Sequence, residues 1–209
     1  MSDKFESALK IILEYEGGND NDPHDPGGRT SRGIIQREYN LWCRRYNEPI
    51  QSVWLATDDQ IEMIYRENYW DPLMCDDMPA GVDLVLFDSG VNSGCSQAIK
   101  WLQRSLNVVD DGVLGPHTFT AVTDERDIPG LITEICGRRL NMLEHLSIWK
   151  YYHHGWTNRV HDVQSKALEW AKGASTCSQD TKLSLSLSSS LSSALFKPST
   201  SQTLDLAPQ

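Results

Sequence analysis

Apolar residues recur at spacings of three and four through most of the first 173 positions, and this period is what most constrains the fold. The first such stripe consists of Phe5, Leu9 and Ile12. Glu16 continues it on the same helix face, so the four residues have spacings of 4, 3 and 4. Thr57 followed by Gln60 is typical of a capping box at the start of a helix. Residues 131–149 and 156–170 continue the helical period. We therefore expect a mostly α fold.

The composition changes after Gly173. Residues 174–209 are rich in serine, contain no Trp, Tyr or Arg, and carry two Lys and two Asp, so the net charge of −10 resides in residues 1–173. Such a segment buries too little apolar surface to offset its ordering entropy, and we expect 174–209 to be a disordered tail. The Leu–Ser alternation at Leu183, Leu185 and Leu187 leaves a β-strand as an alternative, if another strand pairs with it.

The acidic net charge argues against a nucleic-acid partner, because a phosphate binder needs a basic surface to release counterions. The first ten residues, MSDKFESALK, lack the basic start and apolar run of a signal peptide. No stretch approaches the roughly 20 apolar residues of a membrane span. We therefore expect synthesis in the cytoplasm without membrane insertion.

Five cysteines are scattered along the chain: Cys43, Cys75, Cys95, Cys136 and Cys177. None belongs to a C-x-x-C pair, which argues against a zinc site or a redox motif. We expect free thiols, as in a reducing compartment.

Glu16 is the residue with the clearest chemical potential. It continues the apolar stripe of the first helix, so its carboxyl points towards the core or a cleft beside it. Burial and the negative end of the helix dipole both raise a carboxyl pKa, which suits a general acid. The alternative is that Glu16 only bonds a neighbouring arginine.

The loop that follows, NDNDPHDPGGRTSRGI, is built for rigidity. Pro23 and Pro26 fix their own φ and keep the preceding Asp22 and Asp25 out of the helical region. A short hairpin here returns Asp25 and Thr30 towards the end of the first helix. Two carboxyls and a hydroxyl around a sugar ring or a water form the equipment of a glycoside hydrolase.

A metal site in this loop is the weaker interpretation. Counting twelve residues from Asp20 reaches Ser31, where a calcium-binding EF-hand needs a bidentate glutamate. A cluster of Asp22, His24 and Asp25 would have to converge across a proline. Turn and capping chemistry explains Asp20 and Asp22 more simply.

The segment EGGNDNDPHDPGGRTSRGI resembles the signature of glycoside hydrolase family 108, a group of bacterial and phage N-acetylmuramidases. Further matches are YRENYWDPL, MPAGVDLVLFDSGVNSG and AIKWLQRSLNVVDDGVLGPHTFTAV, so the resemblance covers roughly residues 5–172. It implies a lysozyme-like helical fold with a small β-hairpin after the first helix, and no cofactor. It also implies a catalytic lobe over 1–95 and a helical, peptidoglycan-binding lobe over 96–173.

The family's catalytic glutamate falls on Glu16. By analogy with phage T4-type lysozymes, Asp25 would act as base or electrostatic stabiliser and Thr30 would position the water. Asp22 and Ser31 are close competitors for these two roles.

Three other positions are candidates for substrate contacts. Tyr69 is predicted to stack on a sugar ring, since aromatic faces suit pyranoses. Asp88 and Asn92, one helical turn apart, are predicted to face the cleft, with Asn92 the better candidate for a substrate hydrogen bond. DDGVLGPHTFTAV resembles the turn and helix of peptidoglycan-binding modules, with Asp111 able to cap the helix; alternatively it only joins two helices.

The sequence therefore predicts a monomeric peptidoglycan hydrolase that cuts the β-1,4 bond between N-acetylmuramic acid and N-acetylglucosamine. We expect it to act on the cell wall after export through a holin pore or a secretion route, as an endolysin or wall-remodelling enzyme does. The alternatives are a non-catalytic wall-binding protein, a lytic transglycosylase and a chitinase-like glycosidase.

Overall fold

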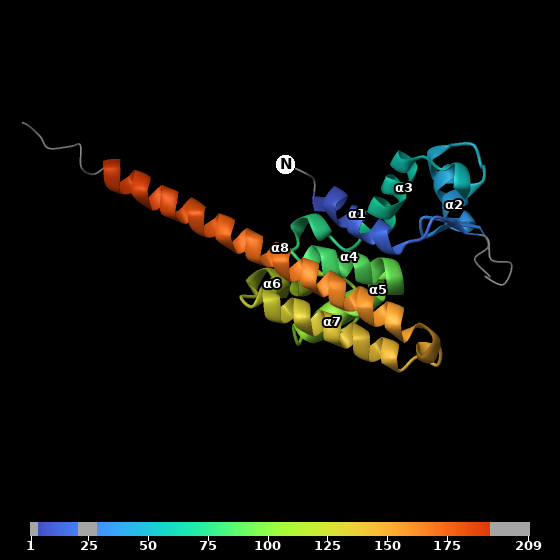
Figure 1. The fold of residues 1–209 in the computed structure, drawn as a ribbon. Coiled ribbons are helices and arrows are strands. Elements are labelled where there is room, and N and C mark those ends of the chain that lie inside the picture. Colours follow the sequence, from blue (N-terminus) through green and yellow to red (C-terminus); the bar gives the residue numbers. More distant parts are fainter. Residues whose placement is uncertain (1–3, 21–28, 193–209) are drawn as a thin grey trace, which may run out of the picture. The chain divides into compact units, whose positions relative to one another are not determined.

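The computed structural model describes residues 4–20 and 29–192 (Figure 1). Residues 1–171 form one compact unit, which contains the candidate site residues discussed below, and residues 172–209 form a second. The boundary expected near residue 95 stays a prediction.

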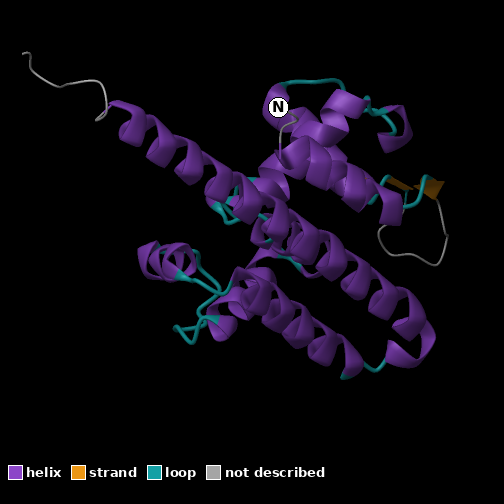
Figure 2. Cartoon of the chain, turned by 60° about the vertical axis from the view of Figure 1, so that its left-hand side comes forward, coloured by secondary structure: helices purple, strands orange, loops and turns teal. Residues whose placement is uncertain are grey.

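The first helix and the small sheet confirm the expected start of the fold. Helix α1, Lys4–Tyr15, buries Phe5, Ala8, Leu9 and Ile12. Three two-residue strands follow in the order β1 (Asn19–Asp20), β2 (Thr30–Ser31) and β3 (Ile34–Ile35). Both pairings are antiparallel, with Asp20 opposite Thr30 and Ser31 opposite Ile34. The hairpin therefore turns back beside the end of α1 (Figure 2).

A second group of helices links the sheet to the rest of the unit. Helix α2 spans Gln36–Tyr46 and is followed by the short turn η1, Val53–Leu55. Helix α3, Asp58–Tyr65, starts at the predicted capping box, in which the Thr57 side chain and Gln60 bond each other's backbone N–H. It continues into the π-helical turn η2, Arg66–Trp70, and the chain then forms η3, Cys75–Asp77.

Helix α4, Val82–Ser93, is the central element, and every residue from Val82 to Gly90 is buried. It packs against α5 (Cys95–Ser105) and α7 (Ile128–Glu144), and also touches α1 and the short turns η2 and η3. The chain enters α4 through Gly81, whose φ is +90° and where an added Cβ would lie 2.3 Å from the Ala167 carbonyl oxygen. Helix α6 spans Pro116–Asp124.

Helix α8 spans Trp149–Ser192. The predicted disordered tail begins inside this helix, and Leu183, Leu185 and Leu187 lie in it rather than in a strand. Propagating an established helix costs much less than nucleating one, so residues of weak propensity can extend it. The predicted tail beyond Ser192 lies outside the described residues.

No helix in the described ranges combines the length and apolarity of a membrane span. Cys43, Cys75, Cys95 and Cys136 are free thiols. Among the residues that the structure describes, no cluster of three His, Cys, Asp or Glu side chains could hold a metal.

Candidate active site

Glu16 directly follows the first helix and is held by an arginine of α8. Its backbone N–H donates to the Ile12 carbonyl at 3.2 Å, and its side chain is 20% exposed. Arg159 of α8 donates from Nη1 to Glu16 Oε1 at 3.0 Å. The Glu16 side chain is therefore largely buried and also bonds an arginine, and its catalytic role stays a prediction.

Arg159 is shared with a second, fully buried carboxylate. Its Nε donates to Asp88 Oδ1 at 2.9 Å, while Arg139 of α7 donates to Asp88 Oδ2. Asp88 is 0% exposed, so the prediction that it faces the cleft is wrong. A buried carboxylate needs partners on both oxygens, and the two arginines supply them.

The four side chains Glu16, Arg159, Asp88 and Arg139 carry formal charges that sum to zero. Burial lowers the pKa of Arg159, but the carboxylates of Asp88 and Glu16 outweigh this effect and raise it above its usual value. Arg159 therefore stays charged and fixes the Glu16 carboxyl from one side. The Arg159 guanidinium lies over the Tyr15 ring, 5.0 Å from its centroid, and makes a cation–π contact with it.

The turn between β2 and β3 approaches the Glu16 carboxyl on the side away from Arg159. Gly33, with φ of +78°, passes so close that an added Cβ would lie 2.6 Å from Glu16 Oε2 and 2.7 Å from the Tyr65 hydroxyl. That hydroxyl donates to the Arg32 carbonyl at 2.8 Å. Burial and the negative charge of Glu16 raise the pKa of Tyr65, so the phenol stays protonated.

The two candidate hydroxyls occupy neighbouring positions of β2. Thr30 is half-buried and its carbonyl accepts from Trp54 Nε1 at 2.9 Å, whereas Ser31 is buried. Successive side chains of a strand point to opposite faces, so Thr30 and Ser31 do not face the same side of the hairpin. Asp22 and Asp25 lie outside the described residues, and their roles stay predictions.

Tyr69 lines a pocket of about 350 Å³, and Glu16 is not among the residues that line it. Its ring lies 5.8 Å from that of Tyr65, which in turn reaches Gly33 and Glu16. The other lining residues, from α2, η2 and α5, are Glu38, Leu41, Trp42, Arg45, Asn68 and Cys95. Asn92, the second predicted substrate contact, is exposed at the end of α4 and accepts from the Ser93 hydroxyl at 3.5 Å. It does not line this pocket.

With this geometry in view, two family models match the chain. Residues 9–94 match "Glycosyl hydrolase 108" and residues 97–161 match "Predicted Peptidoglycan domain". The structure of Brucella abortus SagA superposes with a TM-score of 0.71 and 36% identity, over 80% of this chain and 95% of SagA. No curated protein matches. The chain belongs to the glycosyl hydrolase 108 family.

Family membership supports a glycosidase and peptidoglycan as its partner. The structure adds that the two family segments share one site in this glycosyl hydrolase. Glu16 and Asp88 come from the first segment, whereas Arg139 and Arg159 come from the second. The peptidoglycan segment therefore supplies Arg159, which holds the candidate acid, and Arg139, which holds Asp88.

Arg159 was missed by sequence reasoning, although a spacing on α8 pointed to it. Tyr152, Arg159 and Lys166 recur every seven residues, which returns to nearly the same helix side after two turns. Lys166 bonds Asp162 and also Tyr15, and so fixes the end of α1 on this side. Tyr152 is 55% exposed and its ring stacks on Trp156 at 5.4 Å.

The DDGVLGPHT turn has a structural role. The buried Gln103 amide donates to the Asp111 carboxylate at 2.8 Å and to the Thr118 hydroxyl at 3.1 Å, and it accepts from Gly112 N–H at 2.9 Å. Asp111 therefore does not cap α6, whose N-cap is Gly115 without a side-chain bond. The turn joins α5 to α6 and lies within residues 97–161, which match the predicted peptidoglycan domain.

Proposed function

We propose that this protein is an N-acetylmuramidase that hydrolyses the β-1,4 bond between N-acetylmuramic acid and N-acetylglucosamine, with Glu16 as general acid. The observation that carries the proposal is the fixation of one carboxyl between Arg159 and the turn that contains Gly33. Arg159 binds Oε1, so Oε2, the oxygen on the Gly33 side, is the one available to deliver a proton to the leaving glycosidic oxygen.

Arg159 bonds both Asp88 and Glu16. The bond to Glu16 fixes the orientation of that carboxyl, and the bond to Asp88 pairs the charge of the arginine. A general acid must hold the reacting proton within hydrogen-bond distance of the leaving oxygen, and a small misplacement of the group slows the reaction strongly. In the same proposal Asp25 stabilises the developing positive charge or activates water, and Thr30 positions that water.

The glycan strand is proposed to contact aromatic residues near Glu16. Tyr69, in the 350 Å³ pocket beside Tyr65, offers a ring wall with the polar groups of Glu38 and Asn68 nearby. Tyr152 stacks on Trp156 about 10 Å further along the α8 stripe from Arg159. Aromatic faces and scattered polar groups are the surfaces that sugars prefer. The proposal includes action at the cell wall after export by a holin or a secretion route.

The deciding experiment digests purified peptidoglycan with wild type, Glu16→Gln and the matched control Glu14→Gln, followed by mass spectrometry of the products. Glu14 is 54% exposed and lies two residues away on the same helix. We expect Glu14→Gln to retain activity and Glu16→Gln to lose at least about 100-fold, while both keep the wild-type circular dichroism spectrum.

Activity of Glu16→Gln at the wild-type level would exclude the catalytic assignment. A 1,6-anhydro product would instead identify a lytic transglycosylase. In the same assay, comparing Asp25→Asn with Asp22→Asn tests which loop carboxylate takes part.

A further inference from the structure

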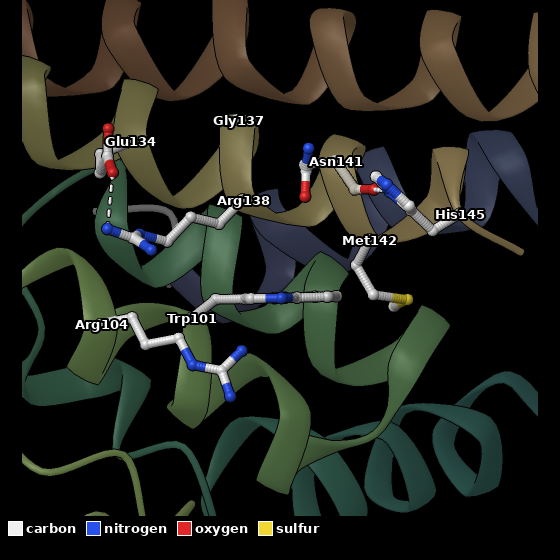
Figure 3. A pocket seen from close by; sticks show the side chains of 8 residues that line it. All are labelled: Trp101, Arg104, Glu134, Gly137, Arg138, Asn141, Met142 and His145. Atoms are coloured by element: carbon white, nitrogen blue, oxygen red, sulfur yellow. Dashed lines mark hydrogen bonds and ion pairs between the residues drawn. The ribbon is translucent and has the colours of Figure 1, made fainter.

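A second pocket, of about 500 Å³, lies between α5 and α7, apart from the Glu16 site (Figure 3). Its lining consists of Trp101, Arg104, Glu134, Gly137, Arg138, Asn141, Met142 and His145. Successive helix residues point about 100° apart, so Arg138 faces this pocket while Arg139 reaches Asp88 in the core. The same turn of α7 thus serves two separate sites.

The pocket gathers cationic donors over an apolar floor. The Trp101 indole is buried, and Figure 3 shows it between the side chains of Arg138, from α7, and Arg104, from α5. Met142 extends the apolar surface, and Asn141 adds an exposed amide beside it. An anionic group with an aliphatic stem would find complementary partners here.

Both arginines form ion pairs with exposed carboxylates of the chain, and a ligand carboxylate can displace these or bind beside them. Arg138 pairs with Glu134 at 2.8 Å and Arg104 pairs with Asp110, and all four side chains are at least 36% exposed. Exposed ion pairs of this kind contribute little to stability. In addition, the buried Nε of Arg138 has no hydrogen-bond partner among the residues that the structure describes.

The overall charge narrows the class of ligand. A chain with a net charge of −10 repels anions over most of its surface, whereas the lining of this pocket, with two arginines and Glu134, carries a formal charge of +1 and would accept a carboxylate. Guanidinium groups bind carboxylates in a planar, two-pronged geometry that suits a short acidic peptide.

We propose that the α5–α7 pocket binds carboxylate groups of the peptide stems that peptidoglycan carries. This inference rests on the proposed function, because the stems are attached to the glycan strand that Glu16 would cut. The pocket would then favour peptidoglycan over glycans without peptides, such as chitin.

The test measures peptide binding to the full chain carrying Glu16→Gln, so that no glycan chemistry contributes. The probe is a synthetic stem tetrapeptide with free carboxylates, titrated by calorimetry and compared with the same peptide fully amidated. We expect Arg138→Gln to weaken binding at least tenfold. The matched control Arg126→Gln removes the same charge from an exposed site outside the pocket and should bind normally.

A second pair of variants tests the pocket without changing its charge. An added Cβ at Gly137 meets nothing within 4 Å, so Gly137→Leu fills the pocket and leaves the arginines in place. Gly173, a helical glycine with equally open space, gives the control Gly173→Leu. Gly137→Leu should lose peptide binding and Gly173→Leu should keep it.

Equal affinity of Arg138→Gln and Arg126→Gln, or equal binding of the amidated peptide, would overturn the proposal. So would competition by inorganic phosphate at the peptide's own affinity, because that result indicates a general anion site. Failure of this binding test leaves the digestion by Glu16 intact, whereas failure of the muramidase assay leaves the peptide titration unaffected, so the two failures are distinguishable.

Discussion

Arg159 Nη1 lies 3.0 Å from Glu16 Oε1, although the two residues are 143 positions apart in the chain. The contact joins the end of α1 to the N-terminal part of α8. Because the same guanidinium also binds the buried Asp88, the orientation of Glu16 depends on the packing of three helices.

Replacing Arg159 should damage stability and activity together. Arg159→Leu leaves Asp88 with Arg139 alone, and removing one partner of a buried charge pair costs about 3–5 kcal/mol. Arg159→Lys keeps the charge but loses the planar fork that spans two carboxylates, so we expect an intermediate loss. Unfolding in guanidinium chloride measures the loss of stability, and the muramidase assay measures the loss of activity. The exposed variant Arg126→Gln is the control. Wild-type stability of Arg159→Leu would show that the network is not needed.

Gly33→Ala should reduce activity more than stability. The left-handed φ of +78° costs an L-residue about 1–2 kcal/mol. The new methyl group would also lie 2.6 Å from Glu16 Oε2 and displace it, and a shift of about 1 Å can cost 100-fold in rate. Gly17→Ala, where a Cβ meets nothing within 4 Å, is the control. Equal activities of the two variants would contradict the idea that the close approach of Gly33 positions the Glu16 carboxyl.

The sequence predicted those parts of the fold and site that depend on local pattern. The stripe of Phe5, Leu9 and Ile12 placed Glu16 inward, and the loop chemistry predicted the hairpin. Local pattern carries no information on which helices pack together. The partners of Glu16 and the burial of Asp88 were therefore missed, because both depend on α7 and α8 meeting α4.

Tyr152→Ala should raise KM for peptidoglycan about tenfold with little change in kcat, if a sugar ring stacks on the Tyr152–Trp156 pair. Tyr151→Ala is a matched control, because Tyr151 is 71% exposed and points about 100° away from Tyr152 on the helix. Tyr152→Phe keeps the ring and should behave as wild type. Steady-state kinetics on soluble glycan fragments separates KM from kcat, and equal KM values for the two alanine variants would refute the contact.

Gln103→Ala should destabilise the α5–α6 turn without affecting the chemistry. The amide of Gln103 bonds four groups of the turn, including Asp111 and Thr118, and it is 1% exposed. Leaving such buried groups unsatisfied costs about 1–3 kcal/mol. Gln97→Ala on the same helix is the control. Urea unfolding should show the loss while kcat stays unchanged; a selective loss of kcat would instead place the turn in catalysis.

Asp162 should make a small, pH-dependent contribution to stability beside the site. Hydrogen bonds from Lys166 and Tyr15 lower the pKa of Asp162, so the folded state binds its proton less readily than the unfolded state. The stabilisation is therefore present above the unfolded pKa of about 4 and is lost as the pH falls through the lower folded value. Because the pair is largely exposed, Asp162→Asn should cost less than about 1 kcal/mol at pH 7. Urea unfolding of both proteins from pH 7 to pH 3 checks this, and a difference that stays constant over that range would disprove the linkage.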